Sequence, residues 1–414
     1  MVKNFPKSLS IAAIGLVLAV SLSACADVDS GTMTSNQPSN SSNSSQTVDQ
    51  SDTSNSMSQA MTQVSNGDTI EVGAIFPLTG DGAAYGEPMQ KVAQIALNEI
   101  NANGGVNGKK LEFLWEDGKC NGNDASAAAN KLINVDHVQV IYGGFCSSET
   151  LAIAPIAEVA HVIVLSPGSS SPDITNAGDY VFRNYPSDAT QGKVLAQGAQ
   201  KVGFKKVGVL AEQNDYTLGI QKVFQDQFQQ LGGSVEVENY LPTDSDFRTV
   251  LLKLKADNVD ALLIDPQTPA KADLIFKQLQ EMNWKVKLMG NDVVAGYQDL
   301  ITKYAKLVEG MITAEFTYDK TNPDFQKLVD EYKKETGKDL PYGTYASTSY
   351  DAVYIVKEAL AKVGNNADAI KDYLYAIKDR KGLGGTLNFD ENGDPKAGHS
   401  LEIVKDGKVV LYNK

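Results

Sequence analysis

The sequence predicts an α/β protein with two doubly wound lobes, each a mainly parallel sheet covered by helices. Three observations support this fold class. About 350 residues after position 67 have an ordinary globular composition, which is enough for two domains. Within them, short β-branched runs alternate with segments of helical period, as in parallel sheets flanked by helices. The alternation begins again after Asp188, so it forms two series.

The first series contains four expected strands and three expected helices. Its first helix carries a clear signal, because Val92, Ala96 and Ile100 share one face and two glycines at 104 and 105 mark its end. The strands are expected at 70–76, 111–115, 138–142 and 162–165, and the helices at 86–101, 124–133 and 148–159.

The second series repeats the same rhythm. Because open parallel sheets bind ligands beyond the carboxyl ends of their strands, two such units predict a cleft between two lobes. The helices are expected at 190–202, 218–231, 247–256 and 270–282, and the strands at 207–211, 235–240, 261–264 and 288–289.

The N-terminus predicts export and lipid attachment. Lys3 and Lys7 precede an uncharged run over 8–24, and residues 22–25 read Leu-Ser-Ala-Cys. This is typical of a bacterial signal peptide over 1–24, followed by a lipid-modified cysteine at position 25, Cys25. The alternative is a membrane anchor that keeps its apolar run, but the run is short for a span and small residues stand before the cysteine.

Residues 25–67 are expected to form a disordered tether behind the lipidated cysteine. They are rich in Ser, Asn, Gln, Thr and Asp and contain hardly any aromatic or branched aliphatic residue. Such a segment buries too little apolar surface to offset its ordering entropy. A coil of about 40 residues reaches roughly 35 Å on average, so the folded part would stay near the membrane surface.

The charge balance is acidic. The chain has 37 basic and 51 acidic residues, a formal charge of -14, and the loss of Lys3 and Lys7 with the signal peptide would make it more negative by two. This excess argues against nucleic-acid or anionic-lipid binding by the folded part.

Cysteine and histidine usage predicts a disulfide and no metal site. In an exported chain, Cys120 and Cys146 are expected to form a disulfide that closes a loop of about 26 residues and contributes roughly 3 kcal/mol. The three histidines, at positions 137, 161 and 399, are scattered rather than spaced as metal ligands. No cofactor is expected.

The segments after the expected strands are the candidate binding elements. Turns rich in small and hydroxyl residues follow two strands, at 143–149 and 166–171, and each opens toward a helix. Free backbone N–H groups there, with Ser147 and Ser170 beside them, suit a carboxylate. Ordinary N-capping by serine is the alternative reading.

Other chemistries find little support. The glycines within 80–86 resemble a dinucleotide loop, but the third comes one place late and no acidic partner stands at the usual distance. No Gly-x-Ser-x-Gly elbow is present, and neither His161 nor His399 stands at a strand end. The acidic segment 390–394 lacks the downstream glutamate of a calcium loop. An enzyme is therefore not expected.

The order and spacing of several motifs resemble the leucine/isoleucine/valine-binding proteins of ABC importers, which have the type I periplasmic-binding fold of two Rossmann-like lobes joined by three hinge strands. The resemblance runs from about Glu71 to the C-terminus. The motifs that carry it are the segment 80–86, the pair Cys120 and Cys146, the turns at 146–148 and 166–168, Asp215 with Tyr216, and the segment 289–292.

The resemblance implies a role for individual residues. Ser147, Gly168 and Ser170 would hold the α-carboxylate of an amino acid. Tyr85 would flank the ligand, and Tyr216 would close over it from the second lobe. Asp292 would pair with the α-ammonium. The other tyrosines of the second half, including Tyr345, are expected to pack the lobes or line the hinges.

Two departures from the family pattern concern the ligand. The usual glutamate is replaced by Asp292, which is one methylene shorter, so the ammonium must lie deeper or a water must bridge. A usual aromatic residue is replaced by Gln267, which removes apolar wall and adds a donor and an acceptor. A polar or larger amino acid, or an amide, therefore becomes an alternative to a branched aliphatic one.

The resemblance also implies discontinuous lobes, with lobe 1 at 68–187 and 318–396 and lobe 2 at 188–317 and 397–414. The function expected is that of a monomeric, extracytoplasmic lipoprotein that binds an amino acid and delivers it to the permease of an ABC importer. The alternatives are a sensing subunit that signals to a membrane receptor or envelope enzyme, and an exported hydrolase, for which nucleophile and base are missing.

Overall fold

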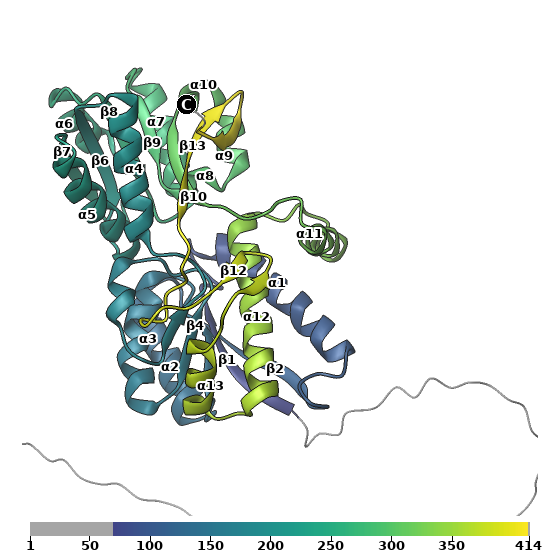
Figure 1. Ribbon diagram of the computed structural model, residues 1–414. Helices are drawn as coiled ribbons and strands as arrows, with labels where there is room; N and C mark the ends of the chain where they lie inside the picture. The colour runs from purple at the N-terminus through teal and green to yellow at the C-terminus, as the bar shows by residue number, and fades with distance from the viewer. Residues whose placement is uncertain (1–68, 413–414) are drawn as a thin grey trace, which may run out of the picture. The chain divides into compact units, whose positions relative to one another are not determined.

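The computed structural model describes residues 69–412, and the expected signal peptide, the expected lipidation site Cys25 and the expected tether lie outside the described residues. Two sheets organise this part of the chain (Figure 1). We call the part around the five-stranded sheet the first lobe and the part around the seven-stranded sheet the second lobe. Within residues 69–412, no helix has both the length and the apolar character needed to cross a bilayer.

The first lobe contains a wholly parallel sheet in the order β2-β1-β3-β4-β5. Both β3 and β4 are buried along their whole length, as expected for a sheet covered on both faces. The strands are β1 (Thr69–Phe76), β2 (Lys110–Asp117), β3 (Val140–Gly143), β4 (Ile163–Ser166) and β5 (Val181–Arg183).

Helices from two distant stretches of the chain cover this sheet. The late helix α12 packs on α1, and α2 packs on α3 (Figure 1). The short hairpin strands β11 (Arg380–Gly382) and β12 (Gly385–Leu387) follow the late helices. The helices are α1 (Ala83–Ala102), α2 (Gly122–Asn134), α3 (Ser147–Ala160), η1 (Pro172–Asn176), α11 (Pro323–Thr336), α12 (Gly343–Val363) and α13 (Ala367–Tyr375).

The second lobe contains a mixed sheet in the order β14-β13-β10-β9-β8-β6-β7. The pairings β10 with β13 and β13 with β14 are antiparallel, and the others are parallel. The strands are β6 (Lys206–Glu212), β7 (Ser234–Tyr240), β8 (Ala261–Asp265), β9 (Lys287–Gly290), β10 (Ile312–Phe316), β13 (His399–Lys405) and β14 (Lys408–Leu411).

The helices of the second lobe are longest near the start of its sequence. α4 packs on α5 (Figure 1). α5 contacts β6 and β7, and α4 contacts β10 and β13. The helices are α4 (Asp188–Val202), α5 (Asp215–Gln230), α6 (Arg248–Ala256), α7 (Pro269–Glu281), α8 (Asp292–Ala295), α9 (Gln298–Lys303) and α10 (Ala305–Val308).

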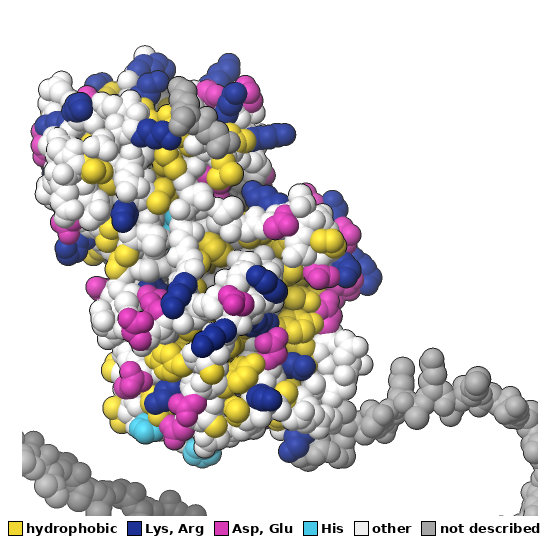
Figure 2. Space-filling view, viewed as in Figure 1, with side chains coloured by type: hydrophobic (Ala, Val, Ile, Leu, Met, Phe, Trp, Pro, Cys, Tyr) yellow, Lys and Arg dark blue, Asp and Glu magenta, His cyan; other side chains and the backbone are white. Residues whose placement is uncertain are grey.

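The chain passes between the sheets three times: from β5 to α4, from β10 to α11, and from β12 to β13 (Figure 1). The expected α/β fold of two parallel-sheet lobes is confirmed. The residue limits given above for lobes 1 and 2 stay a prediction. On the face seen in Figure 2, acidic and basic side chains are interspersed rather than gathered by sign.

All strands and helices of the two expected series are present, with ends that differ by a few residues. The two series left out several elements of the described part that complete the sheets or cover them, among them β5, β10, β13, β14, α12 and α13. β5 has three residues, too few to show a period. α12 is buried on most of its surface, so the polar stripe that marks an amphipathic helix is weak.

Candidate functional site

A narrow cavity lies between the two lobes, at the carboxyl ends of their strands. Its volume is about 20 Å³, enough for one or two water molecules, so the lobes are almost closed on each other. A larger guest requires the lobes or the lining side chains to move apart. The lining residues are Tyr85, Phe145, Cys146, Ser147, Gly168, Ser170, Tyr216, Gln267, Val293 and Tyr345.

On the side of the first lobe, two hydroxyl-rich turns are tied together. The carbonyl of Gly144, after β3, accepts hydrogen bonds of 2.7 Å each from Thr150, Ser166 and Ser169. The two expected turns are therefore neighbours. Because the three donors come from α3, the end of β4 and the turn that follows, this carbonyl fixes their relative positions.

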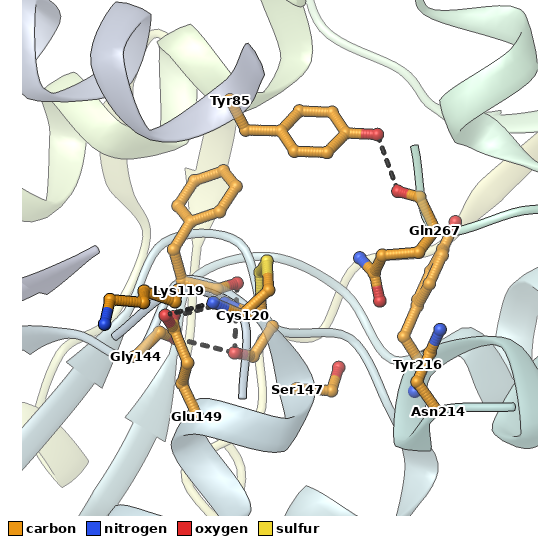
Figure 3. The surroundings of a disulfide bond; sticks show 12 residues. Tyr85, Lys119, Cys120, Gly144, Ser147, Glu149, Asn214, Tyr216 and Gln267 are labelled. Carbon is orange, nitrogen blue, oxygen red and sulfur yellow. Dashed lines mark hydrogen bonds between the residues drawn. A yellow bond between two sulfur atoms is a disulfide. The ribbon is translucent and has the colours of Figure 1, made fainter. Parts of the chain in front are cut away.

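Ser147 joins the two turns directly. It is the first residue of α3, and its hydroxyl oxygen accepts the N–H groups of Ser170 at 3.3 Å and Ser171 at 3.1 Å. Because these bonds use the oxygen as an acceptor, the hydroxyl proton of Ser147 stays available for another partner. The side chain of Ser147 lies at the edge of the space that Tyr85, Tyr216 and Gln267 also surround (Figure 3).

The disulfide between Cys120 and Cys146 is present, with 5.2 Å between the Cα atoms, so the expected pairing is confirmed. Glu149 reinforces it, because its carboxylate accepts the N–H of Cys120 at 3.0 Å and that of Cys146 at 2.9 Å (Figure 3). Burial raises the pKa of Glu149 to about 8, although these N–H groups act in the opposite direction. The disulfide thus anchors the cavity wall at Cys146.

On the side of the second lobe, helix N-caps position three of the predicted residues. Asn214 caps α5 and places Tyr216 two residues further, while Thr268 caps α7 directly after Gln267. Asn291 caps α8 in front of Asp292, and its amide also donates to Asp265 at 2.8 Å. Each of these residues therefore sits at the turn between a strand end and a helix, as an open α/β sheet requires.

Asp292 lies beside the cavity rather than on its lining. It is 2% exposed and accepts hydrogen bonds from three tyrosine hydroxyls. Tyr216 donates to Oδ1, whereas Tyr185 at 2.9 Å and Tyr345 at 2.8 Å donate to Oδ2. A carboxylate offers about four lone-pair positions, so about one stays free, on Oδ1.

These three hydroxyls are held as neutral donors. Burial, followed by the negative charge of Asp292, raises the pKa of Tyr185, Tyr216 and Tyr345 well above the ordinary tyrosine value. They therefore keep their protons throughout the physiological range.

Aromatic rings form one wall of the cavity and also connect the lobes. The hydroxyl of Tyr85, on α1, donates to the backbone carbonyl of Gln267 at 2.7 Å (Figure 3). The Tyr85 ring lies 6.3 Å from Phe145 and 6.0 Å from Tyr345, between ring centroids. Phe145 packs closely on Gly168, since a Cβ atom built there would lie 2.7 Å from the ring.

The structure brings six of the seven predicted ligand residues to the cavity lining, and it places Asp292 next to it. Tyr345 was expected to pack the lobes or line a hinge, but it also lines the cavity. It lies inside α12 rather than directly after a strand, so the segments that follow the strands gave no signal for it. Phe145 and Val293 were also missed, although each adjoins a predicted residue.

Two lobes, three chain passes and a cavity at the facing strand ends define a solute-binding protein of the type I periplasmic-binding fold. A family model described as periplasmic binding protein matches residues 69–405, and the chain belongs to this family. The resemblance inferred from the motifs is thereby confirmed.

The chain is 29% identical over 333 residues to a leucine-, isoleucine-, valine-, threonine- and alanine-binding protein of Pseudomonas aeruginosa. The match covers 80% of this chain and 88% of the relative. It matches a crystal structure of a leucine-binding protein from Thermotoga maritima with a TM-score of 0.75 and 28% identity, over 83% of this chain and 98% of that one.

A branched-chain amino acid transporter substrate-binding protein from Streptococcus pneumoniae, solved in complex with isoleucine, matches with a TM-score of 0.73 and 28% identity, over 83% of this chain and 100% of that one. These relatives are solute-binding proteins rather than enzymes.

Proposed function

We propose that this protein is an extracytoplasmic, lipid-anchored receptor that binds an amino acid between its lobes and delivers it to an ABC importer of the branched-chain type. One observation carries the proposal. A cavity between the lobes has the hydroxyl of Ser147, at the start of α3, on one side and a buried carboxylate beside the other. These groups match the two charges of a zwitterion.

The acid end of the ligand would bind to the first lobe. Ser147 opens the fourteen-residue helix α3, and its hydroxyl proton is free to donate toward the cavity. Backbone N–H groups and the positive end of the helix dipole at this position favour an anion. Gly168 and Ser170, on the neighbouring turn, complete this side of the cavity.

The amine end would bind to the free lone pair of Asp292. Three phenol hydroxyls orient this carboxylate, so it needs no reorganisation to accept an N–H donor. A buried ammonium without a partner costs several kcal/mol, so the acid makes the difference between binding and exclusion. Because Asp292 lies behind the lining, the amine would reach it between Tyr216 and Tyr345.

Closure of the lobes would accompany binding. The cavity of about 20 Å³ is too small for an amino acid, so the ligand must enter while the lobes are apart and must widen the space between them. Ligand binding can then shift the open-closed equilibrium only by its preference for the closed form. The closed form is the state that a permease would recognise.

The lining also restricts the side chain of the ligand. Tyr85, Phe145 and Tyr345 present rings, and Val293 adds an aliphatic surface. Gln267 is the polar group of this wall. This combination suits a branched aliphatic or aromatic side chain, and it leaves room for one that ends in an amide.

The test is a thermal-shift screen of the purified folded part against the twenty amino acids, each with its deaminated acid and its amide. We expect one or a few amino acids to raise the melting temperature, and neither derivative to do so. An equal shift with the deaminated acid would contradict the proposal. Uptake of the identified amino acid in a strain that lacks the gene, with and without a variant in which Cys25 is serine, tests delivery and anchoring.

A further inference from the structure

A second, wider cavity lies between the two lobes, beside the narrow one described above. Its volume is about 370 Å³, within the usual range of small-molecule sites, and none of its lining residues lines the narrow cavity. Tyr85 adjoins both spaces, because it lines the narrow cavity and its ring lies 4.9 Å from that of Tyr342, which lines the wider one. We call the wider space the side cavity.

Both lobes contribute to the wall of the side cavity. Ala84, in α1, and Tyr342, directly before α12, belong to the first lobe. Pro269 opens α7 and Leu300 lies in α9, and both belong to the second lobe. A molecule held in the side cavity therefore contacts both lobes at once. Its apolar parts would be removed from water against this largely aliphatic wall, which is favourable.

Two tyrosine rings form the aromatic part of the wall. Tyr297, directly before α9, stacks on Tyr342 with 5.6 Å between the ring centroids and 18° between the ring planes. Tyr342 is 3% exposed, and its hydroxyl oxygen is covered and has no hydrogen-bond partner within the described residues. Because such atoms are rare in native proteins, this hydroxyl indicates a polar group of a bound molecule as its partner.

The charges of the side cavity favour a cation. Lys303 already pairs with Asp273, whereas Asp299 forms no ion pair within the described part of the chain. Burial, followed by the neighbouring Tyr297 and Asp299, raises the pKa of Tyr342 well above the ordinary tyrosine value, so Asp299 lies near this hydroxyl. An ammonium between the two groups can donate to both, and tyrosine faces also attract cations.

Each of these features has an ordinary explanation when it is taken alone. An exposed acid such as Asp299 is usually solvated, and a crevice between two lobes usually holds water. The combination exceeds these explanations, because an aliphatic wall, a covered hydroxyl without a partner and an acid without an ion pair meet in one space of sufficient size.

We propose that the side cavity is a second binding site, which takes an organic ammonium ion with an apolar body. The apolar body would lie against Ala84, Pro269 and Leu300, with the ammonium between Asp299 and Tyr342. Because the hydroxyl of Tyr342 is covered, its ring must shift when the ammonium binds. This site does not depend on the proposed binding of an amino acid in the narrow cavity.

Occupation of the side cavity should favour the closed form of the protein. A molecule that contacts both lobes binds better when the lobes are together, and it can shift the open-closed equilibrium by that preference. An amino acid that closes the cleft and an ammonium ion in the side cavity should therefore tighten the binding of each other by the same factor.

The test is a calorimetric titration of the folded part with phenethylamine, and with phenethyl alcohol as a neutral probe of the same shape. We expect phenethylamine to bind about threefold tighter, since an ion pair at an exposed rim is worth little more. This preference should disappear in Asp299→Asn and fall in Tyr342→Phe. Asp257→Asn is the matched control, because Asp257 is also an exposed acid of the second lobe but does not line the cavity.

Equal affinity for the two probes, or a preference that survives in Asp299→Asn, would overturn the inference. Loss of the preference in Asp257→Asn would also overturn it, because the charge effect would then be unspecific. Tyr342→Phe removes a hydroxyl without a partner, so it should melt no lower than the wild type. A lower melting temperature would show that the hydroxyl serves the fold and contradict its role in binding.

Phenethylamine is also an amino acid without its carboxylate, so its entry into the narrow cavity is the competing outcome. Saturation with L-leucine, or with the amino acid of the largest thermal shift, should leave phenethylamine bound and tighten its binding. Displacement by the amino acid would contradict the inference. If no amino acid binds, the proposed function fails, but the comparison of Asp299→Asn with Asp257→Asn still decides whether the side cavity is a site.

Discussion

The hydroxyl of Tyr345 donates a hydrogen bond of 2.8 Å to Oδ2 of Asp292. This bond joins α12, which packs on α1 of the first lobe, to the start of α8 in the second. Tyr185 donates to the same oxygen at 2.9 Å. The proposed amine partner is therefore held by the lobe that faces it, and its orientation depends on closure of the cleft.

Removal of one of these donors should weaken binding without disturbing the fold. In Tyr345→Phe the ring stays and one hydrogen bond to a charged acceptor is lost, which is worth about 1.5–3 kcal/mol. We expect roughly a tenfold loss of affinity and little change in melting temperature of the ligand-free protein. Tyr350→Phe is the control, since Tyr350 donates to Glu99 and neither residue lines the cavity. Equal affinity in both variants would show that Asp292 needs no such orientation.

The disulfide should stabilise the fold. Cys120 and Cys146 are 26 residues apart, and a loop of this length is worth about 3 kcal/mol. Denaturant unfolding with and without reductant should show this difference, and mass analysis without reductant should show the two cysteines joined. A double variant with serine at both positions should lose all sensitivity to reductant. Free thiols in exported protein would contradict the pairing.

Gly168 should limit the width of the cavity. A Cβ atom at this position would lie 2.7 Å from the ring of Phe145, so Gly168→Ala must push that ring. We expect a tenfold or greater loss of affinity for the identified amino acid. Gly398→Ala is the control, because its nearest neighbours would be at 3.7 Å, an ordinary contact. Unchanged affinity in Gly168→Ala would mean that the ring has room to move.

Stability should fall as the pH rises from 5 to 8. Burial raises the pKa of Glu315 to about 8 and that of Glu402 to about 7, and the charge of Glu402 adds to the effect on Glu315. Above the ordinary pKa of glutamate, the unfolded chain loses these protons while the folded protein keeps them. A rise in pH therefore lowers the free energy of unfolding until the two glutamates also ionise in the folded protein. Each group contributes at most about 1.4 kcal/mol per pH unit.

The measurement is the melting temperature between pH 5 and 9 for the wild type and Glu315→Gln. The variant should show a flatter decline up to about pH 8, because Glu315 no longer titrates. Parallel curves for the two proteins would contradict this origin of the pH dependence.

The sequence predicts the fold and most of the candidate site because both depend on local patterns. Alternating periods define the sheets, and position after a strand identifies Ser147 and Ser170, whereas Gln267 and Asp292 come from the resemblance. The contacts of Tyr345 could not be predicted in this way, because they depend on how α12 returns to the first lobe.

The direct test of the central claim is a calorimetric titration of the identified amino acid into the wild type and Asp292→Asn. The variant keeps the shape of the side chain and removes its charge, so the ammonium would be buried without that partner. We predict at least a hundredfold loss of affinity, since removal of one partner of a buried ion pair costs about 3–5 kcal/mol. Affinity within threefold of the wild type would contradict the account.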